Sequence, residues 1–359
     1  MKIMFSGGGT LGPVVPLLAI KEIYNKHDAE AKFVWVGTSN GPEKELVEQY
    51  GIPFFTIAGG KFRRYFSFWN FVDFFKVIWG FFGSLILLWK EKPNLLVSGG
   101  GFVSVPLHWA AFCLGIPAWI HQQDYELGLA NKLMSKSAKK ITTALREGRK
   151  FFPENKTEWV GNPVRDLVVK NSAESKRKFN IPENAPVIFA LGGGTGSMKI
   201  NSMVLQILPH LPNDWHVIHL VGKDRPRGLQ EKAAGAFANY HVYQFFKEEM
   251  KHAYAAADVV VARAGFATIT EMASLRKAAI LMPMAGTHQN ANAKMLAENR
   301  AAIIFNEDED GMKMAKIITD LIRNPEARKF LGERLHTVLP PAKPEKIIEI
   351  IHNLTGASP

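Results

Sequence analysis

Three glycine-rich turns are the features of the sequence best suited to bind a ligand. They occupy residues 7–12 (GGGTLG), 99–101 (GGG) and 192–196 (GGGTG), and each follows a strand-like run. Glycine lets a backbone approach a ligand closely, and a helix that begins after such a turn offers free N–H groups and partial positive charge to a phosphate. The sequence therefore predicts phosphate-binding turns at the carboxyl ends of strands.

The first turn also satisfies the G-x-G-x-x-G pattern of dinucleotide sites, through Gly7, Gly9 and Gly12. A site for NAD needs an acidic residue at the end of the second strand, where it binds the ribose hydroxyls. That strand ends FVWVGTSN at residues 33–40, without a carboxylate. We therefore expect the turn to hold the phosphates of another ligand, and we expect no cofactor.

The most specific stretch covers residues 257–296, where two strand-like runs are each followed by polar side chains. Thr268 and Glu271 are expected at the start of a helix. A carboxylate there either complements the helix dipole or accepts hydrogen bonds from a nucleotide ribose, and the sequence leaves both roles open. His288 and Gln289 follow the next strand and are expected at the same rim.

The turns belong to two series of alternating strands and helices. The strand-like runs of the first series are 2–7, 32–37, 95–100 and 117–122. Those of the second series are 187–194, 216–222, 240–245, 258–263, 278–283 and 301–306. This alternation predicts an α/β protein with two doubly wound parallel sheets, joined near GNPVRD at residues 161–166.

Composition limits the partners and the compartment. Lys and Arg number 44 against 33 Asp and Glu, and the net charge of +11 favours a polyanionic partner: nucleic acid, an anionic membrane or a phosphorylated substrate. No RRM, KH or helix-turn-helix signature is present, so we expect no nucleic acid. The single cysteine, Cys113, excludes an internal disulfide and indicates the cytoplasm, and MKIMFSGGG lacks the apolar run of a signal peptide.

The segment 61–92 is rich in aromatic residues and carries basic residues at both ends. The basic residues are Lys61, Arg63, Arg64, Lys90 and Lys92. Its longest uncharged run, Val77 to Trp89, has thirteen residues and is short for a membrane span. Docking on an anionic lipid surface and packing of one helix face on the sheet both explain the composition.

The acidic stretch NEDEDG at residues 306–311 resembles the start of a calcium loop. Ile317 stands where such a loop needs a bidentate glutamate. We therefore expect a solvated loop and no metal site.

In the order and spacing of its motifs, the chain resembles the MurG family of bacterial glycosyltransferases. The shared stretches are the first glycine turn, the second one with FVSVPLHWAAFCLGIP, HQQDYELGLANKLMSKSAKKI, GNPVR, LGGGTG, RAGFATITE and HQNANA. The family has the GT-B fold, two Rossmann-like domains facing a cleft. Its members move N-acetylglucosamine from UDP-GlcNAc to the polyprenyl-pyrophosphate-linked muramyl-pentapeptide lipid I, giving lipid II for peptidoglycan.

The resemblance implies a division of labour along the chain. Residues 1–162 form the domain that binds the acceptor and the membrane, 163–340 form the domain that binds UDP-GlcNAc, and 341–359 form a helix that packs back on the first domain. The enzyme is then cytoplasmic and peripheral on the inner face of the cell membrane.

The resemblance also assigns site residues. Glu271 holds the uridine ribose, Thr268 and Arg165 lie near the donor phosphates, and Phe246 lines the uracil pocket. The full donor-binding set is Arg165, Gly194, Thr195, Phe246, Lys247, Thr268, Glu271, His288 and Gln289. The acceptor-binding set is Gly8, Gly9, Thr10, Gly12, Gly100, Gly101 and Asn131.

The chain departs from the family pattern mainly on the acceptor side. Pro13 replaces the histidine of the first family loop, G-G-T-G-G-H, and Leu11 replaces a glycine; the family's H-E-Q-N appears here as H-Q-Q-D. Inverting transfer needs a base for the acceptor hydroxyl, and Asp124 is the first candidate and His121 the second. Asp124 as a helix cap and His121 as a structural residue stay open, as does an altered relative that uses another acceptor or only binds nucleotide sugar or lipid.

Overall fold

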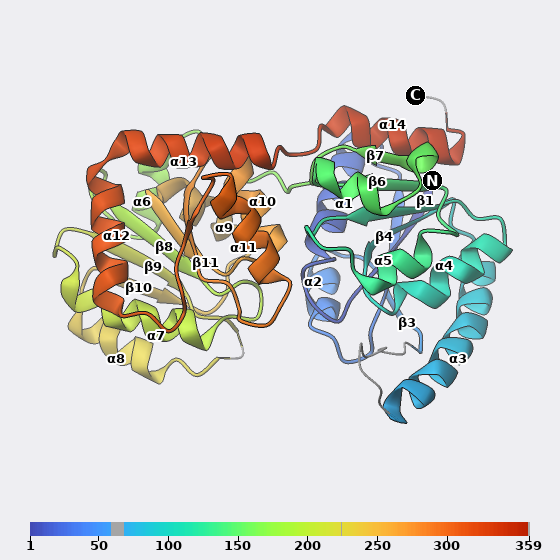
Figure 1. Cartoon of the computed structure of the whole chain (residues 1–359), viewed down its shortest axis with the longest axis horizontal. Helices are drawn as coiled ribbons and strands as arrows, with labels where there is room; N and C mark the ends of the chain where they lie inside the picture. Colours follow the sequence, from blue (N-terminus) through green and yellow to red (C-terminus); the bar gives the residue numbers. More distant parts are fainter. Residues whose placement is uncertain (59–67, 224, 358–359) are drawn as a thin grey trace. The chain divides into compact units, whose positions relative to one another are not determined.

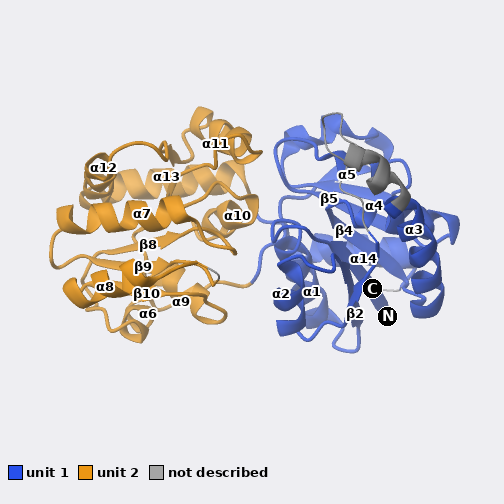
Figure 2. Ribbon diagram, turned by 90° about the horizontal axis from the view of Figure 1, so that it is seen from below, with its two compact units in different colours: residues 1–165, 341–359 blue, residues 166–340 orange. Residues whose placement is uncertain are grey.

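The computed structural model describes residues 1–58, 68–223 and 225–357. The chain forms two compact units, coloured separately in Figure 2. Unit 1 consists of residues 1–165 and 341–359, and unit 2 of residues 166–340. In both units strands alternate with helices (Figure 1).

Unit 1 is built on a parallel sheet with the strand order β3-β2-β1-β4-β5-β6-β7. Its strands are β1 (Lys2–Gly7), β2 (Lys32–Gly37), β3 (Phe54–Thr56), β4 (Leu95–Gly100), β5 (Ala118–Gln122), β6 (Lys140–Thr143) and β7 (Thr157–Trp159). Its α-helices are α1 (Val15–His27), α2 (Glu43–Gln49), α3 (Phe68–Glu91), α4 (Ser104–Cys113), α5 (Leu129–Met134) and α14 (Pro344–Thr355). The short 3₁₀ helices are η1 (Arg146–Phe151) and η2 (Glu154–Lys156).

Helices cover both faces of this sheet, which is why its central strands are apolar almost throughout. Alternate residues of β1 face opposite cores: Phe5 packs with Leu17 of α1 and Ile347 of α14, whereas Met4 packs with Leu88 of α3. The last helix is therefore part of the unit 1 core, although the whole of unit 2 separates it from the rest of that unit in the sequence.

Unit 2 repeats the architecture with the strand order β10-β9-β8-β11-β12-β13, again parallel. Its strands are β8 (Val187–Leu191), β9 (His216–Leu220), β10 (Tyr240–Tyr243), β11 (Val259–Ala262), β12 (Ala278–Leu281) and β13 (Ile303–Ile304). Its helices are α6 (Ser172–Lys178), α7 (Met198–Ile207), η3 (Leu208–His210), α8 (Gly228–Ala236), α9 (Glu249–Ala256), α10 (Phe266–Ser274), α11 (Gln289–Glu298), α12 (Gly311–Arg323) and α13 (Pro325–Val338).

Each strand-like run of the sequence contains a strand of the structure, and the prediction of two doubly wound parallel sheets is confirmed. The strands β3, β6 and β7 were not predicted. They have three or four residues each and lie at or near the edges of the sheet. In both sheets, the order reverses beside the first strand, so the crevice for a ligand is expected at the carboxyl ends of β1 and β8.

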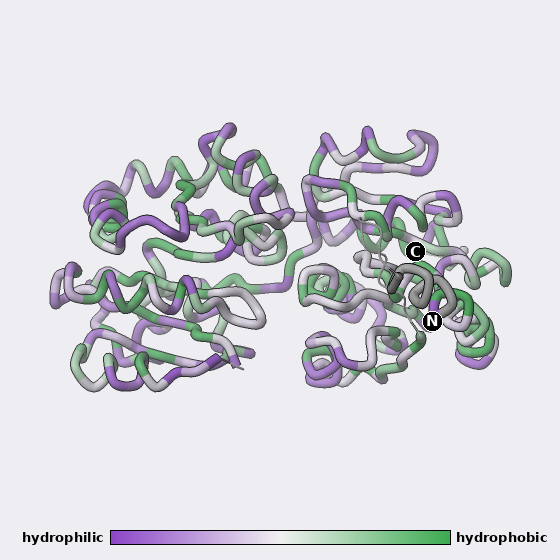
Figure 3. Tube along the Cα trace, turned by 60° about the horizontal axis from the view of Figure 1, so that its bottom comes forward, coloured by the Kyte–Doolittle hydropathy of each residue, from purple (hydrophilic) through white to green (hydrophobic). Residues whose placement is uncertain are grey.

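The helix α3 lies entirely within the aromatic segment 61–92, and the hydropathy of its described residues is coloured in Figure 3. Val77, Ser84 and Leu88 are buried against the rest of unit 1. Of the basic residues at its start, Lys61, Arg63 and Arg64 lie outside the described residues. Within the described part of the chain, no helix has the length and apolar character needed to cross a bilayer.

Candidate active site

The two glycine turns of unit 1 pack backbone against backbone at the carboxyl ends of β1 and β4. A Cβ atom on Gly101 would lie 2.8 Å from the carbonyl oxygen of Gly8, and one on Gly99 would overlap the carbonyl oxygen of Pro13. Gly101 also has a backbone φ of +96°, which residues other than glycine rarely adopt. The turns therefore form one surface, and a larger residue would separate them.

A buried carboxylate, Glu43, lies directly behind the first turn, and the sequence analysis missed it. Its Oε1 accepts hydrogen bonds from the backbone N–H and hydroxyl of Thr38 at 2.7 and 2.5 Å, and its Oε2 accepts one from the N–H of Gly9 at 3.2 Å. A Cβ on Gly8 or Gly41 would overlap this carboxylate. Glu43 has no exposed surface, so its carboxylate supports the turn and cannot bind the hydroxyls of a ribose.

His121 at the end of β5 is fully buried, and both its ring nitrogens have partners. Nδ1 lies 2.9 Å from Oγ1 of Thr142, and Nε2 lies 2.7 Å from Oδ1 of Asn162. Burial lowers the pKa of His121 to about 4. This geometry favours the structural role over that of a general base.

Asp124 lies half-buried on the loop that follows β5. Gln122 shapes this loop, because its Nε2 donates to the carbonyls of Asp124 and Glu126, both at 2.9 Å, and its Oε1 accepts from Nδ2 of Asn131 at 2.7 Å. The N-cap of the next helix, α5, is Gly128, so Asp124 does not cap it. Of the two candidate bases, Asp124 is the one at the rim of the sheet.

Two buried carbonyl oxygens beside the turns, Oε1 of Gln123 and Oδ1 of Asn131, have no hydrogen-bond partner among the described residues. Both amides are close to glycines: Nε2 of Gln123 lies 3.4 Å from a Cβ built on Gly12, and Oδ1 of Asn131 lies 3.2 Å from one built on Gly100. Buried carbonyl oxygens are normally satisfied. The pair therefore suits a ligand that carries hydroxyl or amide donors.

In unit 2, the turn at 192–196 follows β8, and its middle is open. Gly194 and Thr195 are exposed, whereas Gly196 packs so closely that a Cβ there would overlap the carbonyl of Val221. Ser197 caps α7 by accepting from the N–H of Ile200 at 3.3 Å. The turn and the start of α7 thus have the form of an anion site.

Glu271 lies in the second turn of α10, with 4% of its surface exposed. The first turn of α10 holds no acid, so the helix-dipole role considered for Glu271 does not apply. The hydroxyl of Tyr254 donates to Oε2 at 3.0 Å and orients the carboxylate. Thr268, in the first turn of the same helix, is half-buried.

The loop after β12 brings two more of the predicted donor residues to the same edge of the sheet. His288 is the exposed N-cap of α11, and Oε1 of Gln289 accepts from the N–H of Met284 at 3.1 Å. Asn292 ties α11 to the end of β11, since its Nδ2 donates to the carbonyl of Ala264 at 3.2 Å. These side chains therefore follow neighbouring strands.

The remaining predicted donor residues differ in burial. Phe246 is buried, and its ring lies 4.8 Å from that of Tyr243 and 5.6 Å from that of Phe179, while the following Lys247 is exposed. Phe246 therefore packs in an aromatic cluster. Arg165 belongs to unit 1.

Two expectations concerned metals and the acidic stretch. Among the described residues, no group of three His, Cys, Asp or Glu side chains is arranged to hold a metal ion.

The expectation of a solvated loop at 306–311 is wrong for Glu307, whose side chain is 15% exposed and pairs with Arg263. The ion pair with the buried guanidinium of Arg263 offsets the desolvation of this carboxylate, and the sequence carries no signal for that pairing.

Comparison with known proteins gives the class to which this fold and these turns belong. Residues 3–143 match the glycosyltransferase family 28 N-terminal domain, and residues 187–335 match the C-terminal domain of that family. The chain is 37% identical over 337 residues to a Clostridium perfringens UDP-N-acetylglucosamine–N-acetylmuramyl-(pentapeptide) pyrophosphoryl-undecaprenol N-acetylglucosamine transferase, covering 92% of each chain. It is 33% identical over 363 residues to a Bacillus cereus transferase of the same name, numbered 2, covering 99% of each.

Solved structures agree with this relationship. The crystal structure of Acinetobacter baumannii MurG aligns with a TM-score of 0.73 at 26% identity, covering 98% of this chain and 99% of that one. The UDP-GlcNAc 2-epimerase of Neisseria meningitidis aligns with a TM-score of 0.69 at 14% identity, covering 98% of this chain and all of the other, which shows a common fold. The chain belongs to the MurG family of glycosyltransferases.

The close contact between Gly8 and Glu43 predicts that a side chain at position 8 destabilises the protein. Gly8→Ala should lower the free energy of unfolding of unit 1 by about 1–3 kcal/mol, since the added methyl group forces the buried carboxylate to shift. Gly83→Ala is the control: a Cβ there meets nothing within 4 Å, and alanine within α3 should raise stability by about 0.5–1 kcal/mol. Chemical denaturation measures both changes. Equal effects of the two substitutions would contradict the proposed support of the first turn by Glu43.

Proposed function

We propose that this protein transfers N-acetylglucosamine from UDP-GlcNAc to a polyprenyl-pyrophosphate-linked muramyl-pentapeptide, turning lipid I into lipid II. The observation that carries the proposal is the relationship to transferases of this name, at 33–37% identity over nearly the whole of both chains. In the reaction, an acceptor hydroxyl attacks the anomeric carbon, the bond to UDP breaks, and a base takes the hydroxyl proton.

Unit 2 is proposed to hold the donor. Glu271 binds the ribose hydroxyls, the open turn at Gly194 and Thr195 with the start of α7 binds the diphosphate, and His288 and Gln289 bind the sugar. Arg165 is assigned to the donor phosphates. Within unit 2, the backbone N–H groups of the turn and the dipole of α7 stabilise the charge on the departing UDP without a metal ion.

Unit 1 is proposed to hold the acceptor. Because the N–H of Gly9 is bound to Glu43 and that of Gly100 to Oγ of Ser98, the pyrophosphate is assigned to the part of the first turn from Thr10 to Gly12 and to Gly101 in the second turn. The unpartnered carbonyls of Gln123 and Asn131 accept hydroxyl or amide hydrogens of the acceptor. Asp124 is the proposed base.

The membrane surface is proposed to contact one face of α3. Opposite the buried residues of this helix lies a row of exposed apolar side chains at helical spacing: Ile78, Trp79, Phe82, Ile86 and Trp89, between 38% and 72% exposed. Soluble proteins rarely expose so much contiguous apolar surface. Lys90 and Lys92 at the end of the helix are exposed and suit anionic lipid, so the protein is assigned to the inner face of the cell membrane.

The activity itself is tested by incubating the purified protein with UDP-GlcNAc and a short-chain lipid I analogue and detecting the product by mass spectrometry. We expect lipid II analogue and UDP in equal amounts. Binding of UDP-GlcNAc without transfer would instead identify a relative that has changed its acceptor or lost activity.

The donor assignment predicts that Glu271→Ala weakens UDP-GlcNAc binding by about 1.5–3 kcal/mol, the range for hydrogen bonds to a charged group. Isothermal calorimetry on the folded variant measures the change. Glu298→Ala removes an exposed acid of α11 in the same unit and should leave the affinity unchanged. Full affinity of the Glu271 variant would refute the ribose assignment.

The base assignment predicts that Asp124→Asn lowers turnover by about 10²–10⁴-fold, since the amide cannot accept the hydroxyl proton. The donor affinity should not change. Glu126→Gln is the matched control, because it neutralises an exposed acid two residues further along the loop. Steady-state kinetics compare the two variants, and wild-type turnover in Asp124→Asn would exclude Asp124 as the base.

The membrane assignment predicts that replacing Trp79, Phe82 and Ile86 together with serine reduces binding to anionic vesicles at least tenfold. Wild-type binding should also fall as salt rises, because each basic residue near the surface contributes about 1 kcal/mol. Vesicle sedimentation measures both effects.

A control with three similarly exposed apolar side chains separates docking on α3 from a general loss of hydrophobic surface. Val168, Leu229 and Phe330 in unit 2 are 52–71% exposed. Their joint replacement with serine should leave vesicle binding intact. Equal losses for the two triple variants would contradict a docking face on α3.

A further inference from the structure

Arg263, just beyond the end of β11, is a buried cation that holds several loops of unit 2 together. It is 7% exposed. Its Nε donates to Oγ of Ser197 at 2.9 Å, and its Nη1 donates to the carbonyls of Met282 at 3.0 Å and Pro283 at 3.2 Å. The same Nη1 lies 2.6 Å from Oε2 of Glu307.

These partners follow four neighbouring strands. Ser197 ends the turn after β8, Arg263 follows β11, Met282 and Pro283 follow β12, and Glu307 follows β13, in the strand order β8-β11-β12-β13. A single side chain therefore couples the carboxyl ends of four of the six strands of the sheet. These are the ends that carry the turn at 192–196, the start of α10 and the loop before α11.

Charge explains why Glu307 matters to this arrangement. A guanidinium buried among carbonyls and a hydroxyl alone is poorly compensated, and removing the partner of a buried charge leaves it strongly destabilised. The carboxylate of Glu307 compensates the charge and occupies the same nitrogen that reaches both carbonyls after β12. Without Glu307, the guanidinium of Arg263 would be more stable turned toward solvent or toward a bound phosphate.

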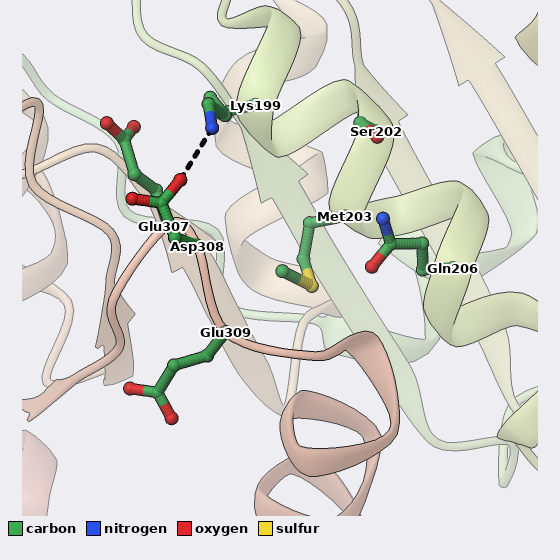
Figure 4. Close-up of a pocket in the computed structure, with 7 residues that line it drawn as sticks. All are labelled: Lys199, Ser202, Met203, Gln206, Glu307, Asp308 and Glu309. Atoms are coloured by element: carbon green, nitrogen blue, oxygen red, sulfur yellow. Dashed lines mark hydrogen bonds and ion pairs between the residues drawn. The ribbon is translucent and has the colours of Figure 1, made fainter.

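The loop that carries Glu307 is anchored on α7 beside this pair. Figure 4 shows Lys199 and Met203 of α7 facing Glu307 and Asp308 across a hollow with a volume of about 250 Å³. Nζ of Lys199 pairs with Oδ1 of Asp308 at 2.7 Å, but both side chains are at least half exposed. Two adjacent acids of one loop thus form two ion pairs, an exposed one with α7 and a buried one with the residue that follows β11.

We propose that Glu307 is a positioning residue for the donor site, acting through Arg263 on Ser197 and on the loop after β12. The proposal rests on the proposed function, because it takes the turn at 192–196 as the place of the UDP-GlcNAc diphosphate. Glu307 holds the guanidinium, the guanidinium holds the Oγ atom that caps α7, and the N–H groups of the turn keep the orientation that a diphosphate needs.

The test compares Glu307→Ala with Glu307→Gln, which keeps an acceptor oxygen without the charge. In the transfer assay with a short-chain lipid I analogue, the alanine variant should raise the KM for UDP-GlcNAc about tenfold. Its kcat and its KM for the acceptor should stay within threefold of wild type. The glutamine variant should recover most of the donor KM, and calorimetry with UDP should show the same order of affinities.

Asp308→Ala is the matched control, since it removes the same charge from the same loop and breaks only the exposed pair. It should leave the donor KM within twofold of wild type. Should Glu307→Ala fail to fold, Ser197→Ala tests the other end of the chain of contacts and should also raise the donor KM. Melting curves establish that each variant is folded.

The outcomes separate the two proposals. Wild-type protein that neither binds UDP nor transfers the sugar would refute the proposed function. Wild-type activity together with an unchanged donor KM in folded Glu307→Ala, or in Ser197→Ala when the first variant is unfolded, would overturn the positioning role. A lower melting temperature with unchanged donor KM would likewise show that the ion pair only stabilises the fold.

Discussion

The site depends first on the close approach of backbone to backbone at the carboxyl ends of the strands. In unit 1, Gly101 packs on Gly8, and in unit 2, Gly196 packs on Gly222, with separations that leave no room for a Cβ atom. Because the turns are packed on their inner side, their remaining N–H groups are directed by the fold rather than by side chains. Helices begin directly after these turns, and the positive ends of their dipoles add to the positive potential of the turn N–H groups.

A buried carboxylate in unit 1 and a partly buried one in unit 2 complete this construction in different ways. Glu43 accepts hydrogen bonds from Thr38 and from the N–H of Gly9, so it stiffens the first turn at the cost of one donor. Glu307 compensates the charge of Arg263 and so keeps this cation buried at the carboxyl ends of the strands. The acids that shape the binding loops are therefore distinct from the acids, Glu271 and Asp124, that are proposed to meet the substrates.

Sequence reasoning predicted what depends on local pattern and missed what depends on long-range packing. The buried strands and the glycine turns were predicted, because apolar runs ending in glycine are local signals. The strands β3, β6 and β7 are too short to show such a pattern. Glu43 could not be told from Glu45 in the same first helical turn, since only the fold brings Gly8, Gly37 and Gly41 around one carboxylate. The pairing of Glu307 leaves no local sequence signal, because its partner, Arg263, lies 44 residues away in the sequence.

The acceptor side shows how a departure from the family pattern can be absorbed. Pro13, in place of a histidine, neither donates nor accepts a proton from its side chain, yet its backbone is part of the contact with Gly99. His121 is committed to Thr142 and Asn162, so it cannot take over as a base without breaking buried hydrogen bonds. The proposed base, Asp124, lies instead on a loop whose shape Gln122 determines. The proposed base on the loop after β5 would make the replacement of the histidine by proline compatible with catalysis.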